Sequence, residues 1–254
     1  MLISYGVCVH NEGQYLLDLL RRLKSHSDSA SEIVILDDYS ADVVTQRILD
    51  GASEDIIIRQ RTHTGDYSEQ KNALNALCKG DFIVNLDADE YLPNALFQSL
   101  EEIITTNPTI DLYFLPRVNI VRGLTHRHIA QYGWNVTQMA GYRTSQQLDP
   151  NSDEYQVLFD YGMIEKEENG YVTYNQPIIQ FPDYQGRIYR NSPDIKWAGK
   201  IHERIVGAKS FSTFPADPEY AIQHFKDIKR QEEQNSLYEQ LQKEETNVQT
   251  STGV

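Results

Sequence analysis

Cysteine, long apolar runs and positive charge are all scarce in this chain of 254 residues. The two cysteines, Cys8 and Cys78, have no metal-type spacing, which predicts reduced core thiols rather than a disulfide framework or a cysteine zinc site. No run approaches the roughly 18 consecutive apolar residues of a membrane span. The first residues also lack the charged start and long apolar stretch of a signal peptide. We therefore expect a soluble, cytoplasmic protein without a membrane span.

Basic residues are outnumbered by acidic ones, and the net charge is −14. This balance argues against non-specific binding to nucleic acid or to anionic membranes. The basic residues are nevertheless grouped. Residues 113–148 contain Arg117, Arg122, Arg127 and Arg143 and no acidic residue, and residues 185–210 form a second basic block.

The first half of the chain alternates between apolar runs and segments of helical spacing. The pattern predicts strands at 2–9, 31–38, 55–60, 81–86 and 110–116, and helices at about 11–25, 43–49, 67–79 and 95–104. This order is typical of an α/β protein with a mainly parallel, doubly wound sheet. Ligands bind such sheets outside the carboxyl ends of the strands.

Polar residues stand at three of these strand ends, as HNE (10–12), DDYSAD (37–42) and DADE (87–90). In the last of them, Asp87 and Asp89 fall on the same side of an extended chain. Two converging carboxylates supply the hard oxygen ligands that Mg²⁺ or Mn²⁺ prefers. The alternative is a solvated acidic turn, but the acidic neighbouring strand ends favour a site.

The second half is less regular. Short strands are predicted at 177–182, 186–190, 195–207 and 220–225, whereas residues 117–175 have weak periodicity. From about residue 226 the composition favours a helix, followed by a frayed end.

Several motifs, taken in order, resemble the family 2 glycosyltransferases of GT-A fold. They are HNEGQYLLDLL, ILDDYSAD, SEQKNALNALCKG, DFIVNLDADEYLP, GRIYRNSPDIKWAGKIHERI and YAIQHFKD, the fifth being similar to small bacterial and bacteriophage members. The resemblance implies a GT-A (Rossmann-like) fold in a single domain over 1–227, with a nucleotide-sugar-binding half (1–116) and an acceptor half (117–227). Residues 228–254 would then be a C-terminal helix and tail.

The resemblance also implies a function, namely transfer of a sugar from a nucleotide-sugar donor, such as a UDP-sugar, with a divalent cation (Mn²⁺ or Mg²⁺) as cofactor. It assigns donor contacts to one set of residues and metal ligation to another. The donor set comprises His10, Asn11, Glu12, Asp38, Lys71, Asn72, Asp87 and His202, although His202 could equally be a packed residue. The metal set comprises Asp87, Asp89 and His224.

Sugar transfer needs a general base, because the acceptor hydroxyl must lose a proton. The candidate is Glu203, with Asp183 as the second choice. Family 2 members more commonly carry a Glu-Asp pair where this chain has His202 and Glu203. They mostly invert the anomeric configuration, which the resemblance extends to this chain.

The acceptor is less defined. Residues 113–148 combine four arginines with interleaved aromatic residues, a pattern that suits a phosphate-bearing or ring-shaped acceptor. A cell-surface glycan or lipopolysaccharide is one possibility, and a hydroxymethylated base in phage DNA, modified in the host cytoplasm, is another.

Two other functional classes remain open at this point. One is a non-catalytic nucleotide-sugar-binding module that has lost its base. The other is a nucleotidyltransferase, although such enzymes usually carry a Gly-rich basic loop where this chain has HNEGQYLL. The sequence does not indicate an oligomeric state.

Overall fold

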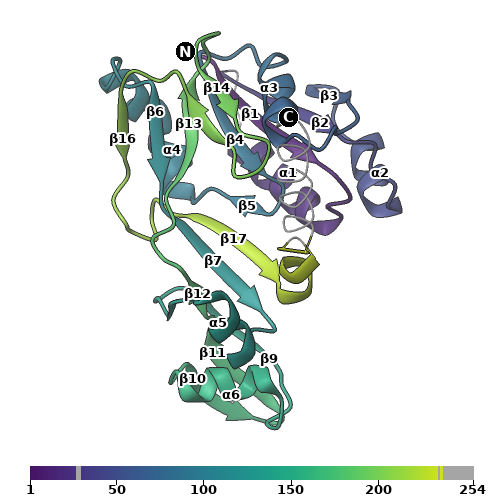
Figure 1. Cartoon of the computed structure of the whole chain (residues 1–254), viewed down its shortest axis with the longest axis vertical. Coiled ribbons are helices and arrows are strands. Elements are labelled where there is room, and N and C mark those ends of the chain that lie inside the picture. Colours follow the sequence, from purple (N-terminus) through teal and green to yellow (C-terminus); the bar gives the residue numbers. More distant parts are fainter. Residues whose placement is uncertain (27–29, 234, 237–254) are drawn as a thin grey trace, which may run out of the picture. The chain divides into compact units, whose positions relative to one another are not determined.

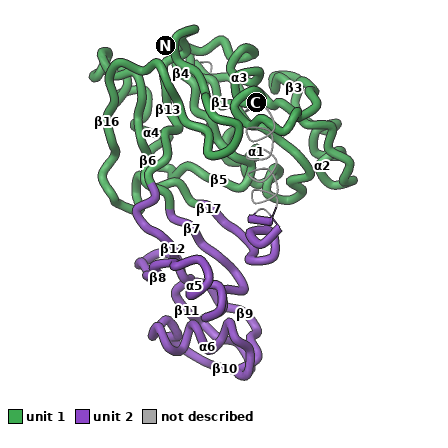
Figure 2. Tube along the Cα trace, in the orientation of Figure 1, with its two compact units in different colours: residues 1–117, 184–223 green, residues 118–183, 224–254 purple. Residues whose placement is uncertain are grey.

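A computed structural model describes residues 1–26, 30–233 and 235–236 of the chain. It consists of two compact units, shown in different colours in Figure 2. Unit 1 comprises residues 1–117 and 184–223, and unit 2 comprises residues 118–183 and 224–254. The predicted C-terminal helix and tail lie outside the described residues from residue 237 onward, whereas residues 228–233 and 235–236 are helical.

Unit 1 is built on a seven-stranded sheet in the order β16-β6-β13-β4-β1-β2-β3 (Figure 1). The strands are β1 (Ile3–Val9), β2 (Ser31–Asp37), β3 (Ile56–Gln60), β4 (Phe82–Asp87), β6 (Leu112–Leu115), β13 (Gln185–Arg190) and β16 (Phe211–Thr213). The helices are α1 (Gln14–His26), α2 (Val43–Asp50), α3 (Tyr67–Asn75) and α4 (Asn94–Thr106). The predicted α/β class with a mainly parallel sheet is confirmed.

The central strands β4, β1, β2 and β3 are mutually parallel, and β13 lies antiparallel between β4 and β6. Strands β1, β2 and β4 come from apolar runs that are buried along most of their length, as a parallel sheet covered on both faces requires. The register aligns Cys8 of β1 with Leu36 of β2 and with Asp87 of β4. The carboxyl ends of these strands therefore meet at one edge.

Side-chain caps determine where helices α2 and α3 begin, and an apolar face determines how α1 packs. Asp42 accepts hydrogen bonds from the amides of Val44 and Thr45 and so begins α2, and Asp66 caps α3 through the amide of Glu69. The helix predicted at about 11–25 is confirmed as α1, which buries Leu16, Leu19, Leu20 and Leu23 on one face.

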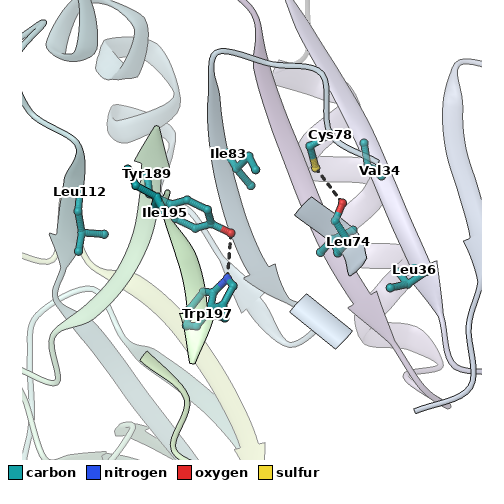
Figure 3. Close-up of a cluster of buried hydrophobic side chains, with 9 residues drawn as sticks. All are labelled: Val34, Leu36, Leu74, Cys78, Ile83, Leu112, Tyr189, Ile195 and Trp197. Atoms are coloured by element: carbon teal, nitrogen blue, oxygen red, sulfur yellow. Dashed lines mark hydrogen bonds between the residues drawn. The ribbon is translucent and has the colours of Figure 1, made fainter. Parts of the chain in front are cut away.

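One face of the sheet packs against α3. Figure 3 shows the apolar cluster there, which consists of Val34, Leu36, Leu74, Cys78, Ile83, Leu112, Tyr189, Ile195 and Trp197. Helix α3 approaches β1 closely, because a Cβ at Gly6 would lie only 3.1 Å from a methyl group of Leu74. Trp197 and Tyr189 are core residues, and the indole nitrogen of Trp197 donates a hydrogen bond to the Tyr189 hydroxyl.

Helix α3 ends at Asn75, before the predicted end at residue 79. The amides of Ala76, Leu77 and Cys78 still donate to carbonyls of α3, whereas Lys79 donates to the Glu32 carboxylate and Gly80 to the Ser4 hydroxyl. A side chain at position 80 would meet the amide nitrogen of Ser4 at 2.6 Å, so this close approach requires glycine.

The strand predicted over 195–207 is instead an antiparallel hairpin of β14 (Lys196–Ala198) and β15 (Arg204–Val206). Its loop turns through positive φ values of 106° at Gly199 and 54° at His202. These left-handed positions break the strand and place Glu203 at the end of the turn. Strand β5 (Glu90–Tyr91) completes unit 1.

Unit 2 contains the region of weak periodicity. Its strands β17 (Ile222–Asp227), β7 (Arg117–Arg122), β12 (Ile178–Ile179) and β8 (Val136–Thr137) are neighbours in that order. A second sheet has the order β10 (Ile164–Glu168), β11 (Tyr171–Asn175), β9 (Arg143–Gln147), and the helices are α5 (His126–Tyr132) and α6 (Asp153–Asp160). The strand predicted at 177–182 shortens to β12, because Gln180 adopts a positive φ of 56°. The described residues of the whole chain include no helix with the length and apolar composition to cross a membrane.

Candidate active site

Two of the sequence-predicted residues, Asp87 and Glu203, lie around the ammonium group of a third, Lys71. This side chain is buried on α3, and its Nζ lies 2.8 Å from Oε1 of Glu203 and 3.6 Å from Oδ1 of Asp87. It also lies 4.4 Å from the ring centroid of Trp197, within cation–π range. One buried cation thus joins the end of β4 to the loop of the β14–β15 hairpin.

Asn72, the next residue of α3, fixes that hairpin. Its Oδ1 accepts a hydrogen bond from the backbone amide of Trp197 at 2.9 Å, and its Nδ2 donates to the carbonyl of the same residue at 2.9 Å. Asn72 was predicted to contact the donor. In the structure its amide is committed to β14 and thereby positions the loop that carries His202 and Glu203.

A second group lies at the ends of β1 and β2. Nδ1 of His10 lies 2.9 Å from the carbonyl oxygen of Asp38 and 3.3 Å from its Oδ2, and Oδ1 of Asp38 accepts from the amide of His63. The His10 side chain is 57% exposed, so that its ring remains accessible to a ligand.

Asn11 organises the loop that follows β2. Its Oδ1 accepts from the amides of Ala41 and Asp42, and its own amide donates to the hydroxyl of Ser40. Its φ is +57°, a left-handed conformation that asparagine tolerates better than most residues. Glu12 lies in the turn before α1, where its carbonyl accepts from the amide of Tyr15.

The region around Asp87 includes residues that the sequence reasoning did not assign. Arg187, on β13, is 3% exposed, and its Nη2 lies 2.6 Å from Oδ2 of Asp87 and 2.6 Å from Oε1 of Glu90. Glu90 is fully buried and also pairs with Nη1 of Arg117 at 2.9 Å. The sequence offered little signal for this network, because the strand that carries Arg187 also contains Gln185 and Arg190. Asp89 is also buried.

Two further predicted residues are linked within unit 2. Nδ2 of Asn119 donates to Oδ2 of Asp183 at 3.0 Å, and Oδ1 of Asn119 lies 2.7 Å from Nδ1 of His224. Because this side of the amide is an oxygen, the facing ring nitrogen of His224 carries the proton. Asn119, which the sequence reasoning missed, therefore sets the tautomer of His224.

Buried groups near Lys71 have shifted pKa values. Burial, above all, raises the pKa of the Cys8 thiol to about 12, with smaller effects from the charges of Lys71, Asp87 and Glu203. Burial also raises the pKa of Tyr67, and the negative charges of Glu203, Asp87 and Asp38 add to that shift. Cys8 is accordingly a core thiol and not a nucleophile.

The side chains at this site can be compared with the ligands that a divalent cation requires. Asp87 presents a partly exposed carboxylate at a strand end, and carboxylate oxygens are the ligands that Mg²⁺ and Mn²⁺ prefer. Within the described residues, no group of three or more His, Cys, Asp or Glu side chains is arranged to hold a metal. An ion held by Asp87 would therefore need most of its ligands from a bound phosphate and water, as Mg²⁺ commonly does.

Three of the four arginines in the basic block of residues 113–148 are engaged by acidic side chains. Arg117 pairs with Glu90, Arg127 with Glu232 at 2.7 Å, and Arg143 with Glu165 at 2.8 Å. Their charge is therefore partly neutralised within the protein, which weakens the argument for a polyanionic acceptor.

Solved structures with a similar fold include two of the S. aureus protein TarS. The chain aligns with TarS 1–349 in complex with UDP-GlcNAc at 16% identity and a TM-score of 0.52, covering 89% of this chain and 58% of that one. With TarS 1–349 in complex with UDP, the identity is 17%, the TM-score 0.52 and the coverage 89% and 60%. The chain thus spans less than two thirds of the TarS fragment.

This likeness shows the GT-A fold. No curated protein matches the chain. The model of the family described as "Glycosyl transferase family 2" matches residues 4–167, more than half of the sequence. The chain therefore belongs to glycosyl transferase family 2.

Proposed function

We propose that this chain transfers a sugar from a UDP-sugar to an acceptor hydroxyl, with inversion at the anomeric carbon. The observation that carries the proposal is the convergence of Lys71, Asp87 and Glu203 at the carboxyl ends of the parallel strands. That edge is where α/β sheets bind nucleotides. The UDP and UDP-GlcNAc complexes of TarS support UDP as the nucleotide.

Glu203 is the proposed general base. Oε1 is oriented by Lys71, and the described residues give its carboxylate no other hydrogen bond, so Oε2 is available to accept a proton. In the proposed step the acceptor hydroxyl gives its proton to Glu203, and its oxygen forms a bond to the anomeric carbon. The bond from that carbon to the phosphate oxygen breaks, and its electron pair remains on the diphosphate.

Lys71 is proposed to have a second role toward the leaving group. Its ammonium is buried between two carboxylates, so that it is already desolvated and fixed before a substrate arrives. A preorganised cation of this kind stabilises developing negative charge at little reorganisation cost. His10 and Asp38, at the adjacent strand ends, are the proposed contacts of the nucleoside.

Asp87 and Asp89 are the proposed carboxylate ligands of a divalent cation. When bound, such an ion supplies Lewis-acid stabilisation of the diphosphate charge. His224 is kept as a proposed ligand on the basis of the sequence. Its tautomer suits that role, since a metal-binding histidine typically donates its other ring N–H to an oxygen. These proposed ligands would suit either Mn²⁺ or Mg²⁺.

Glu203 is preferred to Asp183 as the base. Asp183 accepts a hydrogen bond from Asn119, which joins it to His224, whereas Glu203 pairs with the buried Lys71. Among acceptors, we propose a glycan or lipopolysaccharide rather than a modified DNA base, because the net charge of −14 and the engaged arginines disfavour a polyanion.

The experiment is a donor-turnover assay of the full chain with a panel of UDP-sugars and Mn²⁺, which follows release of UDP. A glycan mixture and hydroxymethylated DNA serve as alternative acceptors. We expect Glu203→Gln to lower turnover by about 10²- to 10⁴-fold while UDP still binds. Glu219→Gln, which neutralises an exposed glutamate of unit 1, is the matched control and should leave turnover unchanged.

Two outcomes would contradict the proposal. Equal turnover in Glu203→Gln and the wild-type chain would exclude Glu203 as the base. UDP binding without turnover of any UDP-sugar would instead favour a non-catalytic binding module.

A further inference from the structure

Arg187 is a buried cation that the proposed chemistry does not use. It stands on β13, is 3% exposed, and reaches Oδ2 of Asp87 and Oε1 of Glu90 through the same nitrogen, at 2.6 Å each. Burial alone would lower the pKa of its guanidinium, but the charges of Asp87 and Glu90 outweigh that effect and raise it. Arg187 is therefore a fixed positive charge beneath the end of β4.

Arg187 is not the only hydrogen-bond partner of the Glu90 carboxylate. Its Oε1 also accepts from Nη1 of Arg117 at 2.9 Å, and its Oε2 accepts from the backbone amide of Asp87 at 3.3 Å. Asp87, Glu90, Arg117 and Arg187 thus form a charge-balanced set of two carboxylates and two guanidinium groups. Arg187 contacts the side chain of Asp87 directly and is linked to its backbone amide through Glu90.

Stability does not account for this network. Buried ion pairs are often no more stabilising than apolar residues of similar volume, because desolvation offsets their attraction. Here the network also leaves a buried polar atom unsatisfied, since Nε of Arg187 lacks a hydrogen-bond partner among the described residues. Each such buried atom costs about 1–3 kcal/mol. Unsatisfied polar groups of this kind are expected where function requires the arrangement.

The network instead constrains one carboxylate. Arg187 occupies Oδ2 of Asp87, whereas Oδ1 faces Lys71 at the longer distance of 3.6 Å. The Asp87 side chain is 38% exposed, although its partners Arg187 and Glu90 are buried. The buried Arg187 therefore holds Asp87 through Oδ2, and Oδ1 faces Lys71, which belongs to the proposed donor site.

We propose that Arg187 is a positioning residue for the donor site, which holds Asp87 so that Oδ1 is the oxygen that would face the cation of a bound nucleotide. This inference rests on the proposed function. Lysine at this position should replace it only partly, since an ammonium lacks the planar fork of the guanidinium group.

The test compares UDP binding in the presence of Mn²⁺ by calorimetry, together with kcat and KM for the UDP-sugar that is turned over. Arg187→Met alone would leave Glu90 with a single cation, so the decisive variant is the double substitution Arg187→Met with Glu90→Gln, which keeps the buried charge balanced. Arg190→Met is the matched control, because Arg190 lies on the same strand but pairs with Asp111.

We expect the double variant to fold and to bind UDP with Mn²⁺ about 10- to 100-fold more weakly, as is typical when support of a metal-site carboxylate is lost. KM for the donor should rise more than kcat falls, and Arg187→Lys should recover part of the affinity. A purely structural residue would lower the melting temperature without this selective change.

Unchanged affinity in a folded double variant, alongside normal binding by the wild-type chain, would overturn the positioning role and leave the proposed function intact. A wild-type chain that binds no UDP would overturn the proposed function, and the role of Arg187 with it.

Discussion

The ammonium nitrogen of Lys71 lies 2.8 Å from Oε1 of Glu203. This contact joins a helix packed on the sheet to the loop of the β14–β15 hairpin, and it brings the proposed base to the end of β4. The position of Glu203 therefore depends on a buried charge pair and on the hydrogen bonds from Asn72 to Trp197.

Removal of Lys71 should destabilise the protein and abolish turnover. Lys71→Met leaves Glu203 and Asp87 without their shared cation, and loss of one partner of a buried pair costs about 3 kcal/mol or more. Chemical denaturation measures this loss, and Lys79→Met, at an exposed lysine, is the control. Adding Glu203→Gln should restore part of the stability but none of the turnover. Turnover by Lys71→Met at the wild-type rate would refute the proposed role of Lys71.

Substitution of Asn119 should change the protonated nitrogen of His224. In the wild-type chain Nδ1 faces the amide oxygen of Asn119, which holds the proton on that nitrogen. In Asn119→Ala we expect a mixture of tautomers, visible in the ¹⁵N chemical shifts of the ring, and a stability loss of about 1–3 kcal/mol from the unpaired buried groups. An unchanged ring spectrum would show that Asn119 does not set the tautomer.

Stability should fall as the pH rises above about 9. Burial raises the pKa of Cys8 and of Cys78 from 9.0 to about 12. Between these values the unfolded chain loses both thiol protons while the folded chain keeps them, so that the free energy of unfolding decreases with pH. It should be measured across this window for the wild-type chain and for Cys8→Ala with Cys78→Ala.

The double alanine variant should lose less stability over the lower part of that window. Its remaining dependence should reflect buried tyrosines such as Tyr189, whose pKa burial also raises. The buried thiol of Cys78 should react with a thiol reagent only after unfolding. Rapid labelling of Cys78 in the folded chain would contradict its burial.

Replacement of Asn85 should stabilise the fold. Asn85 is fully buried in β4, and neither of its side-chain polar atoms has a partner. Asn85→Leu removes this desolvation cost, so that the free energy of unfolding should rise by about 1–2 kcal/mol. The matched variant is Asn75→Leu, which should destabilise, because Asn75 accepts a hydrogen bond from Tyr189. A loss of stability in Asn85→Leu would indicate that the amide is satisfied in solution.

The sequence predicted most of the sheet because β1, β2, β3 and β4 are continuous apolar runs whose order dictates parallel pairing. It did not predict the hairpin at 196–206, where apolar residues continue through the turn and only the left-handed backbone at Gly199 and His202 breaks the strand.

The candidate site was predictable in part. The acidic strand ends marked Asp87, the resemblance indicated Lys71, and the need for a general base indicated Glu203. The network beneath Asp87 could not be found in this way, since it depends on β13 pairing with β4, an antiparallel contact that the apolar pattern does not specify. Nor could the sequence show that Asn72 and Asn11 bind backbone, because the same amide also suits a ligand. Their contacts with a donor remain predictions.

The measurement that tests the central claim most directly is the thermal stability of the full chain with UDP, other nucleoside diphosphates and UDP-sugars, each with and without Mn²⁺. A ligand at 100 times its dissociation constant should stabilise the chain by about 2.7 kcal/mol. We predict such a shift for UDP and one UDP-sugar, dependent on Mn²⁺ and absent in Asp89→Ala when each protein is compared with its own unliganded state. No shift with any nucleotide would contradict a donor site at the ends of β1, β2 and β4.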